Sequence, residues 1–168
     1  MFKNTSIFVR IIAIIVLSNA LFILFVFIFT IPNIKTGIFD ERKQSLKNPV
    51  EMVYSLLDSL NTKVELGQLT LKDAKLKAFE TVSKLKYDDG KNFVWLHNSQ
   101  NIGIVHPNKK LINKDMSDVS DNNGVKYIAE MTKVALANGD GYVSYSFPKP
   151  TDLEHPLPKI SYVKYFKQ

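Results

Sequence analysis

Residues 89–107 read Asp-Gly-Lys-Asn-Phe-Val-Trp-Leu-His-Asn-Ser-Gln-Asn-Ile-Gly-Ile-Val-His-Pro, and this stretch decides the fold. Over 93–97 the aromatic and histidine side chains alternate with aliphatic ones, and a second alternation follows over 102–106. This is the period-two pattern of β-strands with two different faces. A short polar turn separates the two runs. The pattern predicts a β-hairpin that carries Trp95, the one tryptophan of the chain, and two of its three histidines.

Two helices are expected before the hairpin. Apolar side chains spaced by three and four predict a helix over 34–65, and its apolar stripe needs a partner, either a sheet or a second subunit. The stripe consists of Val50, Val53, Tyr54, Leu57, Leu60 and Val64. Because proline removes a helical hydrogen bond, we expect a kink or a helix start at Pro49. Thr70 and Asp73 resemble a capping box and predict a second helix over 71–86.

The elements after the hairpin complete an α+β domain. A helix is expected over 125–138, with Gly139 as its stop, followed by strands over 142–147 and 160–166. Four of the chain's seven prolines lie between these strands and predict a flap-like loop. Helices segregated from an antiparallel sheet define the class. The chain stops directly after a strand at Gln168, so we expect a missing last strand and a chain that is cut short.

An apolar run precedes the domain. Residues 11–31 contain no charged side chain and exceed the ~20 residues that cross a hydrocarbon core as a helix. A cleaved signal peptide is the alternative, but its apolar region is normally about 7–15 residues long and ends in small residues. We therefore expect a retained transmembrane helix. Lys3 and Arg10 precede it, so residues 1–10 are expected in the cytoplasm and residues 33–168 outside.

Composition excludes several classes of function. The formal net charge is +6, but the basic residues are dispersed without a block of the kind that binds nucleic acid, so no nucleic-acid partner is expected. The chain has no cysteine and therefore no disulfide framework. The positive charge is compatible with small anionic ligands.

Metal and catalytic motifs are weak. The acidic loop holds Asp115, Asp118, Asp121 and Asn123 before Gly124. Aligned on a calcium loop, its first ligand position falls on Val119, so a solvated loop is the better interpretation. The three histidines lack zinc-site spacing, no serine sits in a glycine-flanked elbow, and the glycines do not cluster. We expect no enzyme activity, no metal and no cofactor.

A pocket remains as the functional hypothesis. Trp95, His106, Tyr145, Lys159 and Tyr162 lie on or beside predicted strands. Together they offer an apolar box with imidazole, hydroxyl and ammonium donors, which suits a small carboxylate. Lys159 has the parity of Ser161 and should point away from Tyr162. Spacing alone also fits half-buried core aromatics and a solvated lysine.

Six motifs occur in order along the chain: Asp-Gly-Lys-Asn-Phe-Val-Trp-Leu, Val-His-Pro, Asp-Asn-Asn-Gly, Gly-Asp-Gly-Tyr-Val-Ser-Tyr, Phe-Pro-Lys-Pro and Pro-Lys-Ile-Ser-Tyr-Val. Their order resembles the extracytoplasmic single Cache domain (Cache_2 type) of bacterial methyl-accepting chemotaxis proteins and some sensor kinases. The resemblance covers residues 33–168.

The resemblance implies a long helix on a PAS-like antiparallel sheet and a pocket for acetate, propionate, pyruvate or lactate. The implied ligand contacts are Phe93, Trp95, His106, Tyr145, Lys159 and Tyr162, with lysine and tyrosine holding the carboxylate. Ligand closure of the pocket would shift the long helix along the membrane normal. The implied location is the inner membrane, crossed once, with the sensor in the periplasm and a homodimer formed through the long helix.

Two departures and one alternative accompany the resemblance. Family members continue with a further strand, a second membrane helix and a cytoplasmic signalling region, which this sequence lacks. Phe93 and Val94 stand where the family more often has two aromatics, which implies a larger or less enclosed pocket. The alternative function is a ligand-free structural or dimerisation module of a membrane protein.

Overall fold

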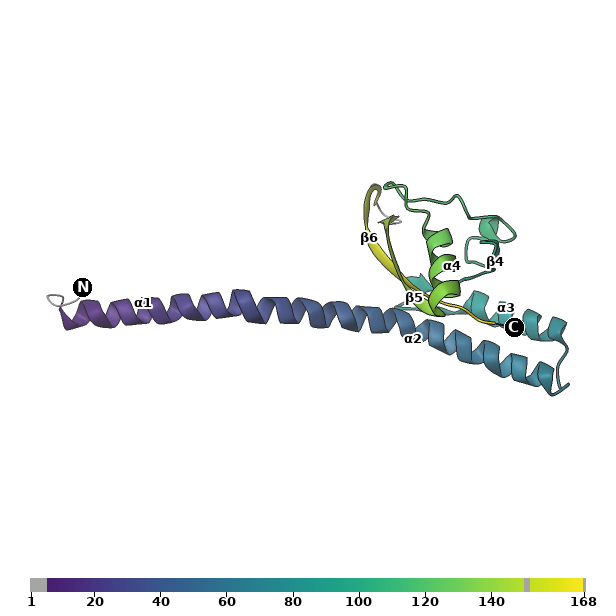
Figure 1. The fold of residues 1–168 in the computed structure, drawn as a ribbon, viewed down its shortest axis with the longest axis horizontal. Coiled ribbons are helices and arrows are strands. Elements are labelled where there is room, and N and C mark those ends of the chain that lie inside the picture. The colour runs from purple at the N-terminus through teal and green to yellow at the C-terminus, as the bar shows by residue number, and fades with distance from the viewer. Residues whose placement is uncertain (1–5, 150–151, 168) are drawn as a thin grey trace. The chain divides into compact units, whose positions relative to one another are not determined.

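The computed structural model describes residues 6–149 and 152–167 (Figure 1). The chain divides into two compact units, Met1–Gln44 and Ser45–Gln168.

The first unit is helical. α1 spans Ile7–Phe25, a π-helical turn spans Val26–Thr30, and α2 spans Ile31–Glu65 and so continues into the second unit. Among the described residues, one helix is long and apolar enough to cross a membrane, with a mean hydropathy of 3.0 over its most apolar window. A signal sequence near an N-terminus passes the same test, so a retained span over 11–31 stays a prediction.

The apolar stripe of α2 packs inside the second unit. Val53 belongs to one buried cluster with Val82 and Val105, and Leu60 packs against two alanines of α3, which spans Leu71–Lys84. Of the two partners left open by the sequence, this part of the stripe uses the chain's own α3 and strands.

Both expectations about helix ends in this region are tested by the structure. The Asp73 N–H donates to the Thr70 hydroxyl over 3.1 Å, which confirms the cap of α3. Pro49 lies inside α2, so a helix start at this position is wrong. Proline removes one hydrogen bond, but α2 continues through it, and Val53 in the next turn is buried in a hydrophobic cluster that stabilises the helix.

The predicted hairpin is confirmed for the residues on both sides of its turn. β3 (Leu96–His97) pairs antiparallel with β4 (Gly103–Val105), with an irregular register between Leu96 and His97. The beginning of the first predicted strand differs, because β2 (Asn92–Phe93) pairs with β1 (Lys86–Tyr87) and not with β4. A tight turn that begins at Asp88, with φ of 54°, folds β2 back onto β1, and the predicted strand is interrupted after Phe93, at Val94 and Trp95.

The last hairpin is longer than predicted. β5 spans Asp140–Lys149 and β6 spans Asp152–Lys164, so the predicted proline-rich loop is wrong in extent. Pro148 lies in β5, Pro156 and Pro158 lie in β6, and Pro150 lies outside the described residues. Among the described residues β6 pairs with β5 alone, and a strand with an unpaired edge tolerates proline because the missing N–H can face that edge.

α4 spans Tyr127–Asn138 and ends at Gly139, whose φ of 85° suits glycine, as predicted. Its residues Ile128 and Met131 form a buried cluster with Val143 of β5. Figure 1 shows α4 (green) beside the hairpin of β5 and β6. The helices and the small antiparallel sheets together confirm the α+β class.

The two faces of the β5–β6 hairpin have different neighbours. Tyr145 pairs with Lys159, and Tyr142 pairs with Tyr162, so the two pairs lie on opposite faces. Tyr145 packs in the cluster that α4 completes, whereas Tyr162 hydrogen-bonds to Glu51 of α2. We call these the α4 face and the α2 face.

Candidate ligand-binding site

A cleft of about 600 Å³ lies in the second unit. Its walls come from α2, α3, α4, residues 93–99 and the end of β6. Phe93, Trp95 and Tyr162 of the predicted ligand contacts line it, whereas the other three lie outside its lining. The predicted residues therefore separate into groups.

Phe93, Trp95 and His106 form an aromatic trio. The ring centroid of His106 lies 5.4 Å from that of Phe93 and 5.7 Å from that of Trp95. The ring centroids of Phe93 and Trp95 are 6.1 Å apart. The Asn108 N–H donates to His106 Nδ1 over 2.9 Å, which leaves the Nε2–H of the neutral ring as a donor. Burial lowers the pKa of His106.

Tyr145 lies in the buried cluster of the α4 face, against which Trp95 also packs. Its ring stacks on Tyr127 with centroids 4.4 Å apart, and its hydroxyl is 2.9 Å from Ser161 Oγ. Burial raises the pKa of Tyr145 to about 12, although the Ser161 hydrogen bond acts in the opposite direction. The hydroxyl therefore stays protonated over the physiological range.

Lys159 is an exposed residue opposite Tyr145 in the hairpin. Its ammonium lies 4.7 Å from the centre of the Phe147 ring, a cation–π contact. Partial desolvation of the ammonium lowers the pKa of Lys159. The ammonium thus stands at the rim of the aromatic cluster, where a carboxylate would find a positive charge.

Tyr162 is not brought together with Lys159 and Tyr145. Its hydroxyl donates to Glu51 Oε1 over 3.1 Å, and Lys164 Nζ donates to Glu51 Oε2 over 2.7 Å. Burial is the first cause that raises the pKa of Tyr162, and the bond to Glu51 adds to it. The strand alternation that separates Lys159 from Tyr162 in the sequence is present in the structure.

Two aromatic residues beside the site were not among the predicted contacts. Tyr127 stacks on Tyr145, and Phe147 meets Tyr145 edge-on at 6.2 Å. Phe147 shares the parity of Tyr145 in the predicted strand, and that signal was enough to find it. Tyr127 lies in the predicted helix over 125–138, and no sequence pattern indicated its contact with Tyr145.

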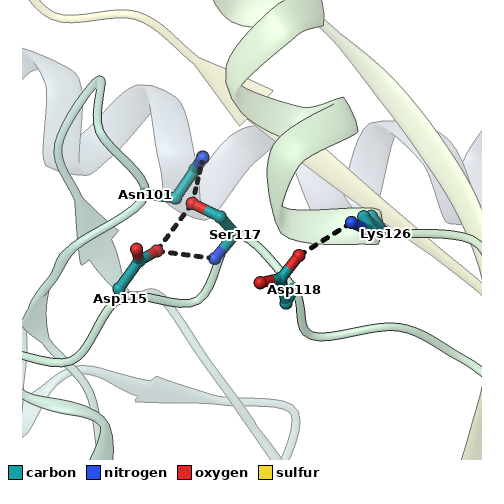
Figure 2. Close-up of polar contacts among 5 residues, drawn as sticks. All are labelled: Asn101, Asp115, Ser117, Asp118 and Lys126. Atoms are coloured by element: carbon teal, nitrogen blue, oxygen red, sulfur yellow. Dashed lines mark hydrogen bonds and ion pairs between the residues drawn. The ribbon is translucent and has the colours of Figure 1, made fainter.

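The carboxylates of the acidic loop accept hydrogen bonds within the protein, and one of them forms an ion pair. Figure 2 shows Asp115 accepting from the N–H and hydroxyl of Ser117, and Asp118 paired with Lys126 over 2.7 Å. Asp121 accepts backbone N–H groups, including that of Ser146 over 2.7 Å. No group of three candidate metal ligands occurs in residues 6–149 and 152–167.

Solved structures with this architecture are sensor domains. A periplasmic sensor domain of a chemotaxis protein superposes with a TM-score of 0.71 and 29% identity, over 77% of this chain and 89% of that one. A Cache chemosensory domain described for carboxylic acid recognition has a TM-score of 0.70 and 26% identity, over 79% and 89% of the two chains. A methyl-accepting chemotaxis protein from Vibrio parahaemolyticus shares the fold at 24% identity, with a TM-score of 0.65 over 80% of this chain and 86% of that one.

The class defined by this fold is the sensor domain of chemotaxis proteins. The chain belongs to the single Cache domain 2 family, which matches residues 38–168. The methyl-accepting chemotaxis protein McpP of Pseudomonas putida (strain KT2440) is 34% identical over 102 residues, which are 60% of this chain. The aligned part is 18% of that relative's length. These similar proteins are a chemotaxis receptor and the sensor domain of a chemotaxis protein.

Proposed function

We propose that residues 33–168 bind a small organic acid such as acetate, propionate, pyruvate or lactate, and act as the extracytoplasmic sensor of a chemotaxis or signal-transduction protein. The observation that carries the proposal is the placement of Lys159 opposite Tyr145 on the α4 face, where Tyr145 and Trp95 pack in one cluster. A cation beside aromatic surface matches a short acid, which has one charge and a small apolar tail.

Each residue has a separate role in this proposal. Lys159 supplies the charge for the carboxylate, and His106 offers its Nε2–H as a second donor. Phe93 and Trp95 cover the carbon chain. Tyr145 orders the wall through its stack and its bond to Ser161. Tyr162, which was also a predicted contact, serves the junction with α2 in this proposal.

The anchoring and assembly of the protein are part of the proposal. The apolar run over 11–31 anchors the chain in the inner membrane and leaves the sensor in the periplasm. The protein forms a homodimer through its long helix. Val53 and Leu60 already pack inside the unit, so the dimer contact uses another surface of α2, such as that of Met52, which is 71% exposed.

The test is calorimetric titration of the full chain in detergent with acetate, propionate, pyruvate and lactate. At least one acid is expected to bind, and Lys159→Ala is expected to weaken it by about tenfold or more, because a charge-assisted hydrogen bond contributes about 1.5–3 kcal/mol. Lys110→Ala is the matched control, since it removes an equal charge from an exposed turn.

Two results would count against the carboxylate site. The first is the absence of binding by all four acids, which favours the ligand-free structural module. The second is an unchanged affinity in Lys159→Ala, which places any bound acid elsewhere. Binding that Lys110→Ala weakens equally would reveal a nonspecific effect of net charge.

A further inference from the structure

The indole of Trp95 is the first member of a hydrogen-bonded network that passes through α4. The network runs, in order, through Trp95, His97, Thr132, Asn101, Ser117 and Asp115. The donor–acceptor distances are 3.1, 3.0, 2.5, 3.0 and 2.6 Å in that order. Trp95 directly precedes β3, and His97 lies in β3. The other members come from the turn after β3, α4 and the acidic loop, and Figure 2 shows the last two links.

Every link in this network has one possible direction. The indole N–H only donates, so Nδ1 of His97 accepts and the neutral ring carries its proton on Nε2. Nε2–H then donates to Thr132 Oγ1, whose own proton goes to the carbonyl oxygen of Asn101. The Asn101 amide donates to Ser117, and Ser117 donates to the carboxylate of Asp115. The direction of the network fixes the tautomer of His97.

The burial of the inner members makes the network costly to break. Thr132 is 9% exposed and is the one buried polar residue in the described part of the chain. An unpartnered buried hydroxyl or imidazole N–H costs about 1–3 kcal/mol. Burial also lowers the pKa of His97, which favours the neutral ring that the network requires.

We propose that His97 is a positioning residue for the binding site: through Thr132 and Asn101 it fixes the indole of Trp95 in the cleft and links it to the acidic loop. This role rests on the proposed function, because it assigns Trp95 to the ligand wall. Since the indole N–H already donates to His97, Trp95 offers the ligand only its apolar ring. Trp95 therefore contacts the aliphatic tail of the acid, and other residues bind its carboxylate.

The network is tested by a pair of substitutions at Thr132 in the full chain. Thr132→Val keeps the shape but removes both hydrogen bonds, whereas Thr132→Ser keeps the hydroxyl. Two readouts need no ligand: the Nε1–H NMR resonance of the single tryptophan and the tautomer of His97 from its ring ¹⁵N shifts. The third readout is the affinity for acetate and propionate.

We expect His97 to be the Nε2–H tautomer in the native protein. Thr132→Val should shift the indole resonance and weaken acid binding by about fivefold, the effect of one hydrogen bond, while Thr132→Ser should match the native protein. At the far end, Asp115→Ala should shift the indole resonance by a smaller amount. Asp118→Ala should leave it in place, because Asp118 pairs with Lys126 outside the network.

An Nδ1–H tautomer of native His97, or an unmoved indole resonance in Thr132→Val, would overturn the network. A shifted resonance with unchanged acid affinity would overturn the positioning role. If the native protein binds none of the four acids, the proposed function fails while the resonance and tautomer still decide the network. The native tautomer also decides it if Thr132→Val does not fold.

Discussion

At the scale of single residues, strand alternation determines which side chains can share a site. Lys159 and Tyr145 are paired across the hairpin and meet the same aromatic cluster, whereas Tyr162 lies on the other face. The separation of Lys159 from Tyr162 follows from their parity in the sequence. The stacking of Tyr127 on Tyr145 does not, because it depends on how α4 packs against β5.

The hydroxyl of Tyr145 leads to a stability prediction. Tyr145→Phe removes the hydrogen bond to Ser161 and should lower the free energy of unfolding by about 1 kcal/mol. Denaturant titration measures this difference, with Tyr165→Phe as the control because Tyr165 is 42% exposed. Equal stability of Tyr145→Phe and the native protein would show that this bond contributes nothing.

At the scale of elements, Glu51 joins α2 to the end of β6. The hydrogen bond from Lys164 is the main cause that lowers the pKa of Glu51, and the bond from Tyr162 and the charge of Lys47 act in the same direction. Residues Ser161 and Tyr162 are neighbours in β6 but face different partners, Tyr145 and Glu51. A displacement of β6 at the site would therefore act on α2 through Glu51.

This junction predicts a pH dependence. Because the pKa of Glu51 is lower in the folded state, its contribution is complete above about pH 4.5, the ordinary value, and is lost as the pH falls through the folded value. Glu51→Gln should lower stability by at most about 1 kcal/mol at pH 7, since solvent screens the partly exposed pair. The difference from the native protein should shrink between pH 5 and pH 3.

Denaturant titrations at several pH values measure this effect. Glu80→Gln is the control, because Glu80 forms a fully exposed pair with Lys84 on α3 and should change stability less. A destabilisation by Glu51→Gln that stays constant down to pH 3 would contradict the assigned role of the carboxylate.

The order of the helices and of the β3–β4 and β5–β6 hairpins was predictable from the sequence, whereas β1 and the extent of the strands were not. The stripe through Val53 and Leu60 and the stop at Gly139 each have a local cause, so pattern alone locates them. The pairing of β2 with β1 and the inclusion of prolines in β6 depend on which strand segments pair with each other, and the alternation of side chains does not specify this. The contact between His97 and Thr132 joins positions 35 residues apart, which no local pattern reveals.

At the scale of the whole molecule, the sensor fold is carried by the second unit, Ser45–Gln168, and the candidate membrane span lies in the helix that starts at Ile7. The family match begins at residue 38 and runs to 168. The aligned part covers 18% of McpP. The central claim concerns the sensor alone.

The most direct test of that claim is a structure of the full chain in complex with propionate at saturating concentration. We predict that the carboxylate lies within hydrogen-bond distance of Lys159 Nζ and that the carbon chain contacts the ring of Trp95. Propionate bound on the α2 face beside Tyr162 and Glu51, or a domain that holds none of the four acids, would contradict the account.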